Sequence, residues 1–295
     1  MNRNFLIFLS VLTGAMLTAC SNEEEAKEMP AEGLPMMVEV SETPLTDADN
    51  GQPVNASTRG DVITSTGFNS FNMSYGGCGE TKPIYTANKN NEGVWIVEGN
   101  WPSDHARNYS FYAYNYGTFI DEVSPYVSFT VDGTPANQYD LLVANTTTSR
   151  TACSGTVPLS FKHACAAVRF NIGQSSTLKG KNITFTEITL VGVCNSGDYH
   201  FNTATWTVLA DPASFTLESA SNISIPVSST SHVGARPLSC SHLFMIPQTL
   251  GASAKLVITY SGGTQSSAEI SLNNETWEAG KRYTYNIRLG TTLIK

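Results

Sequence analysis

The residues with the clearest chemical signature lie near the start of the chain, where a cysteine follows a short apolar run. Leu17-Thr18-Ala19-Cys20 has the composition and order of a lipobox, in which small residues fit a peptidase pocket and the cysteine thiol accepts lipid. The apolar run from Phe5 to Leu17 is too short to cross a ~30 Å hydrocarbon core as a helix. An ordinary secretory signal that happens to contain a cysteine is the alternative, but all four lipobox positions agree. We predict that residues 1–19 are a signal peptide and that Cys20 is the site of lipid attachment.

The rest of the sequence lacks the motifs of common catalytic and metal sites. It has no phosphate-binding loop, no Gly-x-Ser-x-Gly elbow and no His-Glu-x-x-His pair. A glycosidase needs two carboxylates across a cleft, whereas acidic residues such as Glu187, Asp198 and Glu269 are dispersed. The histidines are also isolated, which favours structural roles for them: His105, His163, His200, His232 and His242. We predict no catalytic residue, no metal and no cofactor.

The cysteines after Cys20 argue against a zinc site. No two of them form a Cys-x-x-Cys pair, and their odd number leaves at least one thiol unpaired. They are Cys78, Cys153, Cys165, Cys194 and Cys240. Cys165 and Cys194 lie in apolar runs, where cysteine usually serves as a small buried hydrophobe.

One aromatic stretch could bind a ligand. Between Trp101 and Tyr116 the rings fall on both faces of a single expected strand, and such rings can stack on a sugar while their hydroxyls form hydrogen bonds. The candidate platform is Trp101, Tyr109, Tyr112 and Tyr114. The competing interpretation, which we favour, is that both faces of the strand are buried, because exposed aromatic patches of that size are uncommon.

Charge and composition indicate a β protein that does not bind nucleic acid. Removal of residues 1–19 takes away Arg3, leaving 16 basic and 25 acidic residues and a net charge of −9, and no basic patch is present. Thr, Ser, Asn, Gly, Val and Tyr are abundant, and alternating apolar and polar residues recur throughout. Tyr283–Leu289 is the clearest such strand, and Gly262-Gly263 predicts a hairpin between Leu256–Tyr260 and Ala268–Leu272.

The same alternation suggests how the chain is organised. In Leu159–Ile172 the apolar face switches near Ala164–Ala167: Leu159, Phe161 and Cys165 lie on one face, and Val168, Phe170 and Ile172 on the other. Residues 20–59, rich in Pro, Glu and Asp, read as an acidic tether that contains a removable strand. Length and spacing predict two β-sandwich domains, at residues 60–175 and 176–295.

Several segments together resemble the fimbrillin family of pilus and adhesin subunits from Gram-negative anaerobes. They are Val157–Ala164, Gly197–Phe201 with Trp206, Phe244–Gln248 and Trp277–Tyr285, and the lipobox and acidic tether extend the resemblance. The resemblance implies two tandem transthyretin-like β-sandwich domains and assembly by strand exchange after an arginine-specific protease removes an N-terminal segment. The matching position is Arg59-Gly60, which follows an exposed polar stretch; a linker arginine without a role is the alternative.

Strand exchange, as the resemblance implies it, needs a strand that leaves and one that replaces it. Release of Met36–Val40 or a neighbouring stretch would uncover a sheet edge and an apolar groove for another chain. The expected donor is the C-terminal tail with Thr291, Thr292, Leu293 and Ile294, although this tail is short.

Three functional interpretations follow. The favoured one is a structural or adhesive pilus subunit, anchored through lipid in the outer membrane, exposed at the cell surface and bound to other fimbrial subunits. The second is a non-polymerising surface lipoprotein that binds a glycan or a host protein. The third, an enzyme acting on extracellular glycans, is the least favoured.

Overall fold

The computed structural model describes residues 33–54, 68–76, 83–120, 123–174, 184–208, 212–221, 236–238, 242–261 and 267–289. The chain divides into two compact units, Met1–Gly33 and Leu34–Lys295, and the fold described here belongs to the second. Across the described residues the chain forms strands and one short 3-10 helix, η2, at Pro135–Asn137. This part of the chain has no helix with the length and apolar character needed to span a bilayer. The predicted all-β class is confirmed; the transthyretin-like form of its domains stays a prediction.

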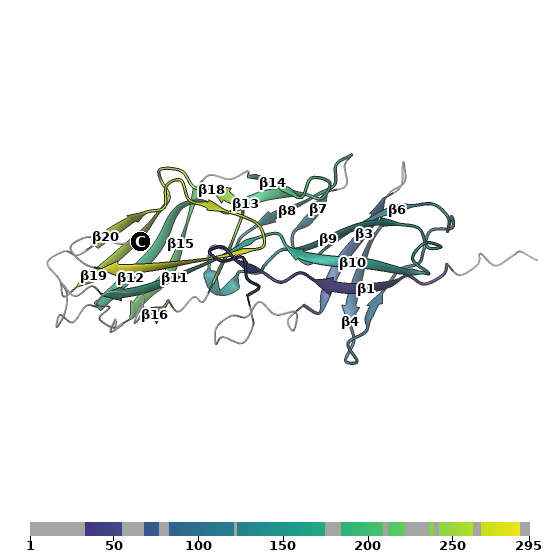
Figure 1. The fold of residues 1–295 in the computed structure, drawn as a ribbon, viewed down its shortest axis with the longest axis horizontal. Coiled ribbons are helices and arrows are strands. Elements are labelled where there is room, and N and C mark those ends of the chain that lie inside the picture. Colours follow the sequence, from purple (N-terminus) through teal and green to yellow (C-terminus); the bar gives the residue numbers. More distant parts are fainter. Residues whose placement is uncertain are drawn as a thin grey trace, which may run out of the picture. The chain divides into compact units, whose positions relative to one another are not determined.

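The largest sheet has seven strands, with β1 at one edge and β5 at the other. Figure 1 shows β1 beside β10. Its order is β1-β10-β9-β6-β3-β4-β5. The pairing of β1 with β10 is parallel, and the other pairings in this sheet are antiparallel. The strands are β1 Met37–Glu42, β3 Ser70–Gly76, β4 Ile84–Lys89, β5 Trp95–Val97, β6 Tyr109–Tyr114, β9 Leu142–Thr148 and β10 Thr156–His163.

The remaining described strands form four smaller sheets. Their orders are β16-β11-β22-β2 with β17 also paired to β11, β15-β12-β19-β20, β14-β13-β8-β7, and β18-β21. The strands are β2 Thr46–Asp47, β7 Thr118–Ile120, β8 Tyr126–Thr130, β11 Ala166–Gln174, β12 Thr184–Cys194, β13 Ser196–His200, β14 Thr205–Val208, β15 Pro212–Ser221, β16 Arg236–Pro237, β17 Leu243–Met245, β18 Gln248–Thr249, β19 Lys255–Ser261, β20 Ser267–Ser271, β21 Thr276–Trp277 and β22 Lys281–Leu289.

The predicted strands follow the alternation in the sequence. In β10 the inward positions are Val157, Leu159, Phe161 and His163, and the residues between them are exposed or half-buried. Tyr283–Leu289 lies within β22, as predicted. The hairpin expected around the Gly262-Gly263 dipeptide is confirmed by the antiparallel pairing of β19 with β20. Period-two apolar spacing is therefore a reliable guide to these strands.

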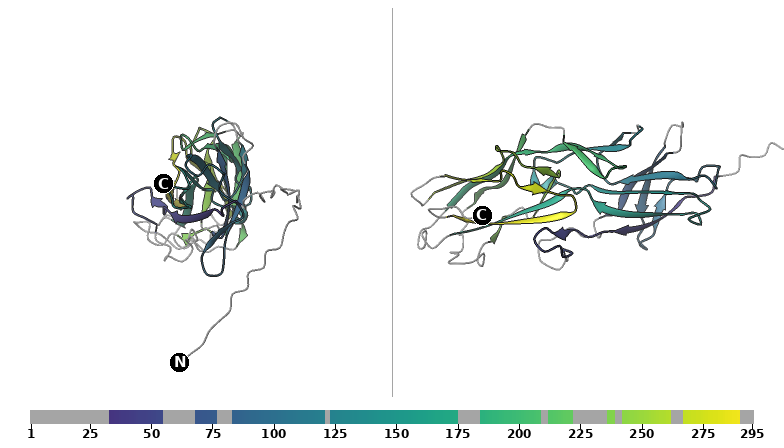
Figure 2. Two further views of the ribbon diagram at one scale, coloured as in Figure 1. Left: turned by 90° about the vertical axis from the view of Figure 1, so that its right-hand side faces the viewer. Right: turned by 45° about the horizontal axis from the view of Figure 1, so that its top comes forward.

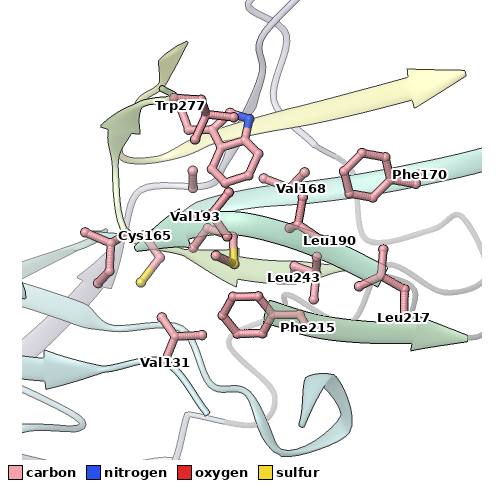
Figure 3. Packing of buried hydrophobic residues seen from close by; sticks show 14 of the residues in the cluster. Val131, Cys165, Val168, Phe170, Leu190, Val193, Phe215, Leu217, Leu243 and Trp277 are labelled. Atoms are coloured by element: carbon pink, nitrogen blue, oxygen red, sulfur yellow. The ribbon is translucent and has the colours of Figure 1, made fainter. Parts of the chain in front are cut away.

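Buried side chains gather into two clusters, and the switch of apolar face along Leu159–Ile172 separates them. β10 buries Leu159 and Phe161 in one cluster, whereas β11 buries Phe170 in the other, part of which is shown in Figure 3. Cys165, which the alternation placed with Leu159, belongs to the second cluster instead. The reason is that β10 ends at His163 and β11 begins at Ala166, so the chain leaves the extended conformation and the alternation restarts.

Both halves of the sequence contribute to the second cluster. Tyr114 from β6 and Val127 from β8 pack in it together with Leu256 and Ile287 from the C-terminal strands. β8 also pairs directly with β13. The division of the chain into domains at residues 175 and 176 stays a prediction.

Candidate functional site

β1 occupies the edge of the seven-stranded sheet and lies along β10 over its full length (Figures 1 and 2). All six of its residues have a partner, from Met37 opposite Thr156 to Glu42 opposite Phe161. The amide of Thr43 continues the ladder by donating to the carbonyl of Phe161 at 2.8 Å. A parallel pair needs a long connection, so β1 is an N-terminal segment added to a sheet built from later residues.

Alternate side chains of the β1 segment enter the first cluster of buried residues. Met36 is 2% exposed and Val38 9%, and Val40 packs against the cluster while remaining half-buried. Met37, between the two buried residues, is 54% exposed. Burial of each such apolar side chain contributes about 1.5–3 kcal/mol. Removal of the segment would therefore uncover a groove with Leu159 and Phe161 of β10 at its base.

The N-terminal end of the segment is held on both sides. The amide of Met36 donates to the carbonyl of Gly99 at 2.9 Å, and the amide of Trp101 donates to the carbonyl of Leu34 at 2.9 Å. The Trp101 indole donates to the carbonyl of Gly155, just before β10, at 3.0 Å. Leu34–Met36 therefore fits between the chain that follows β5 and the start of β10.

The C-terminal end of β1 is held by charge. The His163 imidazole, the last inward group of β10, bonds to Asp140 through Nδ1, and its Nε2 lies 3.5 Å from the carboxylate of Glu42, the last residue of β1. The side chains are 2%, 8% and 16% exposed for His163, Asp140 and Glu42. One imidazole thus links β1 to the body of the sheet.

The pKa values of this charged cluster favour a protonated histidine. Burial lowers the pKa of His163, but the hydrogen bond and charge of Asp140 and the charge of Glu42 outweigh it, and the net shift is upward. Burial raises the pKa of Glu42, the positive charge of His163 lowers it, and the charge of Asp140 raises it, again with a net upward shift. Glu42 Oε2 and Asp140 Oδ1 are buried without a hydrogen-bond partner in the described structure. Among the described residues no three His, Cys, Asp or Glu side chains are placed to hold a metal ion.

A second short strand follows β1 and joins a different sheet. β2 pairs in parallel with the start of β22, and the Arg282 guanidinium donates to the Asp47 carboxylate at 3.0 Å. Leu45, just before β2, is 2% exposed. The segment from Leu34 to Asp47 therefore contacts both β10 and β22, and it precedes Arg59 in the sequence.

The four aromatic residues of the predicted platform are buried. Trp101 is 3% exposed, Tyr109 5%, Tyr112 9% and Tyr114 3%. Trp101 and Tyr109 belong to the first cluster of buried residues, and Tyr112 and Tyr114 to the second, so β6 is covered on both faces. The rings at these positions are core side chains and offer no exposed stacking surface.

The other predicted site residues lie outside the described part of the chain. They are Cys20, Arg59, Gly60, Thr291, Thr292, Leu293 and Ile294. The cluster of His163, Asp140 and Glu42 was not predicted from the sequence, because its members are far apart in the chain. The one signal was the position of His163 in the alternation of β10, two residues after Phe161, which placed its side chain inward.

Comparison with known proteins finds one matching family model and similar solved structures from Bacteroides species. A family model described as fimbrillin-like matches residues 55–295. No curated protein matches the chain. Among solved structures, a fimbrial protein from Bacteroides vulgatus is 15% identical over 87% of this chain and 96% of its own, with a TM-score of 0.56. A candidate cell adhesion protein from Bacteroides ovatus is 13% identical over 88% of this chain and 96% of its own, with a TM-score of 0.55. At these identities the structures are evidence for a shared fold.

Proposed function

The chain belongs to the fimbrillin-like family and is a non-enzymatic fimbrial or adhesin subunit, and from this premise we propose that it is exported as a lipoprotein and assembled by protease-triggered strand exchange. Lipid on Cys20 would anchor the exported chain in the outer membrane. Cleavage between Arg59 and Gly60 would then cut the connection between the β1 segment and the rest of the fold.

The parallel edge position of β1 is the observation that supports this proposal most strongly. β1 and β2 both precede Arg59, so one cut separates them covalently from β10 and β22. The ladder between β10 and β9 is formed by Lys162 and His163, whereas residues 156–161 of β10 pair with β1. Loss of β1 would leave this stretch of β10 with free donors and acceptors, the template that an added strand requires.

Energetics explain why cleavage and exchange are separate steps. Each net backbone hydrogen bond contributes about 0.5–1.5 kcal/mol, and each buried apolar side chain about 1.5–3 kcal/mol. A cut segment therefore stays bound until a donor strand replaces its ladder and fills the positions of Met36 and Val38. The C-terminal tail with Leu293 and Ile294 supplies two apolar side chains for that purpose.

Arg-specific proteolysis of the full chain tests the proposal. The expected product begins at Gly60 and forms detergent-resistant ladders that collapse on heating. Arg59→Lys should abolish both the cut and the ladders while keeping the charge. Arg107→Lys, at an arginine that is exposed in the described part of the chain, is the matched control and should change neither.

Two outcomes would count against the proposal. A product beginning at Gly60 that stays monomeric would favour the non-polymerising surface lipoprotein. A native N-terminus without lipid on Cys20, found by mass spectrometry, would remove the outer-membrane anchor.

A further inference from the structure

Two tyrosines away from the β1 groove form an exposed stacked pair. The rings of Tyr116 and Tyr139 have centroids 4.6 Å apart and an interplanar angle of 26°, and the residues are 40% and 57% exposed. Tyr116 follows the buried aromatic run of β6 and is the residue of that stretch whose ring reaches solvent. Large aromatic surface held in water is unfavourable, so a fixed exposed pair of this kind calls for an explanation.

The backbone is fixed on both sides of Tyr116, by hydrogen bonds of Asn115 and by close packing at Gly117. The Asn115 side chain donates to the carbonyl of Asp140 at 2.9 Å and accepts from the amide of Leu142 at 2.8 Å, which ties the Tyr116 turn to the segment carrying Tyr139. Gly117 has a φ of +92°, and a Cβ there would lie 2.6 Å from Val127 Cγ1 and 2.7 Å from the Ser128 carbonyl. The turn is therefore fixed in one conformation before any ligand arrives.

The segment before Tyr139 is fixed as well. The Gln138 side chain donates to the carbonyl of Asp132 at 3.0 Å and accepts from the amide of Phe244 at 2.9 Å. Asp132 Oδ1 accepts from the amide of Thr134 at 2.7 Å, which sets the orientation of its carboxylate. A surface ordered in this way binds a ligand with little further loss of conformational entropy.

The tyrosine pair borders a small cavity with polar groups on its rim. The cavity has a volume of about 270 Å³ and is lined by both tyrosines, by Phe129, and by Thr130, Asp132 and Asn137. Phe129 is 7% exposed and provides an apolar surface. The volume lies just below the ~300–1,000 Å³ typical of pockets for drug-sized ligands, so it suits a group the size of one sugar ring.

We propose that Tyr116 and Tyr139, together with Asp132 and Asn137, form a binding site for one neutral pyranose unit of a glycan. The apolar C–H face of the sugar stacks on the exposed aromatic surface, and its hydroxyls bond to the carboxylate and the amide. Burial, and secondarily Tyr139, raise the pKa of the Tyr116 hydroxyl, so it stays protonated and can donate a hydrogen bond.

The arrangement of the rings distinguishes a sugar from a cation. An ammonium group is best held when aromatic faces surround it. Here each tyrosine covers one face of the other, so each ring keeps at most one face for a ligand, and the two rings do not enclose a cation between them. This inference does not depend on strand exchange, because the cavity residues are distinct from β1 and β10.

Saturation-transfer NMR on the full chain, with methyl glycosides of glucose, galactose, mannose and N-acetylglucosamine as probes, tests the site. At least one glycoside should receive saturation through its ring C–H protons. Tyr116→Ala and Tyr139→Ala should each weaken its binding about two- to tenfold, the effect of one lost stacking contact. Asp132→Asn should weaken it less, because an amide still offers a hydrogen-bond acceptor.

Tyr85→Ala is the matched control, because Tyr85 also stacks on a tyrosine, Tyr75, at 5.8 Å but does not line the cavity. It should leave glycoside binding unchanged, and unfolding midpoints establish that all variants fold. The proposal is overturned if no glycoside receives saturation, if binding is unchanged in both tyrosine variants, or if tetramethylammonium displaces the sugar more effectively than free sugar does.

Discussion

The pairs β1–β10 and β11–β22 are both parallel and both join distant parts of the chain, but they are built differently. Side-chain hydrogen bonds across them link residues 119 positions apart, Ser41 and Ser160, and 115 positions apart, Asn171 and Asn286. β22 pairs with β11 on one side and with β2 on the other, and β11 also pairs with β16 and β17. β1 has β10 on one side and lies at the edge of its sheet.

The two pairs also differ in what they bury. Phe170, Ile172, Ile287 and Leu289 of the β11–β22 pair are at most 2% exposed and pack in the larger cluster. The β1 segment buries Met36 and Val38 and ends in a charged cluster around His163. Parallel pairing alone therefore does not determine how firmly a strand is held; its neighbours and buried side chains do.

Phe170→Ala should have the largest effect, because it removes an aromatic ring from the core of the β11–β22 pair. Phe170 is 2% exposed and stacks on Tyr285 with centroids 5.2 Å apart. Truncation of a buried phenylalanine costs about 3–5 kcal/mol, and here we expect it to lower the free energy of unfolding of the fold as a whole. Urea denaturation measures the change. A smaller loss than that of the Val38 variant described below would contradict the comparison.

His163→Gln should weaken β1 without unfolding the rest of the protein. Glutamine keeps one hydrogen bond but not the positive charge between Asp140 and Glu42, and hydrogen bonds to charged groups contribute about 1.5–3 kcal/mol. Amide hydrogen exchange should show faster opening of Met37–Glu42, while β22 keeps its protection. His105→Gln is the control and should change stability by no more than about 0.5 kcal/mol. Equal loss of protection in β1 and β22 would show that His163 stabilises the fold generally.

The difference between the two strand pairs also shows what sequence alone can predict. The alternation in Tyr283–Leu289 predicted β22, and Gly262-Gly263 predicted the β19–β20 hairpin, because period two and turn chemistry are local properties. The register of β1 on β10 is set by contacts between residues about 120 positions apart, and no local pattern contains it. The resemblance to the fimbrillin family suggested that an N-terminal strand is removable. The structure identified β10 as the strand with which β1 pairs.

The candidate sites also depend on contacts between residues that are distant in the chain, which local sequence patterns do not contain. The aromatic stretch before Tyr116 was visible in the sequence, but which rings are exposed depends on layers that pack on both faces of β6. Tyr139 becomes a neighbour of Tyr116 through the Asn115 hydrogen bonds, which join residues 25 and 27 positions apart. The local sequence therefore predicted that aromatic side chains gather here, but it did not predict which of them are buried or which residues they contact.

Val38→Ala should have a smaller effect than either variant above. The change removes two methyl groups from a side chain that is 9% exposed, and each buried methylene-sized group contributes about 0.8 kcal/mol. We expect a loss of about 1.5 kcal/mol, seen as faster hydrogen exchange in β1 and in the amides of residues 156–161 of β10 other than Pro158. Met37→Ala, at a neighbouring exposed position, is the control and should leave exchange in β10 unchanged. An unchanged rate in the Val38 variant would mean that β1 is held by its backbone ladder alone.

Raising the pH should have the smallest effect on β1. It should weaken the pairing at the C-terminal end of the strand, where Glu42 lies close to His163. The pKa of His163 is raised in the folded protein, so its stabilising contribution is complete below its ordinary value of 6.5 and is lost as the pH rises through the folded value. The pKa of Glu42 is raised from 4.5, so its ionisation at higher pH also favours the state in which β1 is released. A rise in pH therefore weakens the β1–β10 pair through both His163 and Glu42. Hydrogen exchange of Ser41 and Glu42, corrected for the intrinsic dependence on pH, should accelerate across neutral pH. In His163→Gln the acceleration should be smaller, because only the ionisation of Glu42 remains to drive it. Phe170 and Ile287 should show no such step, and a step of equal size in β22 would contradict the assignment to His163.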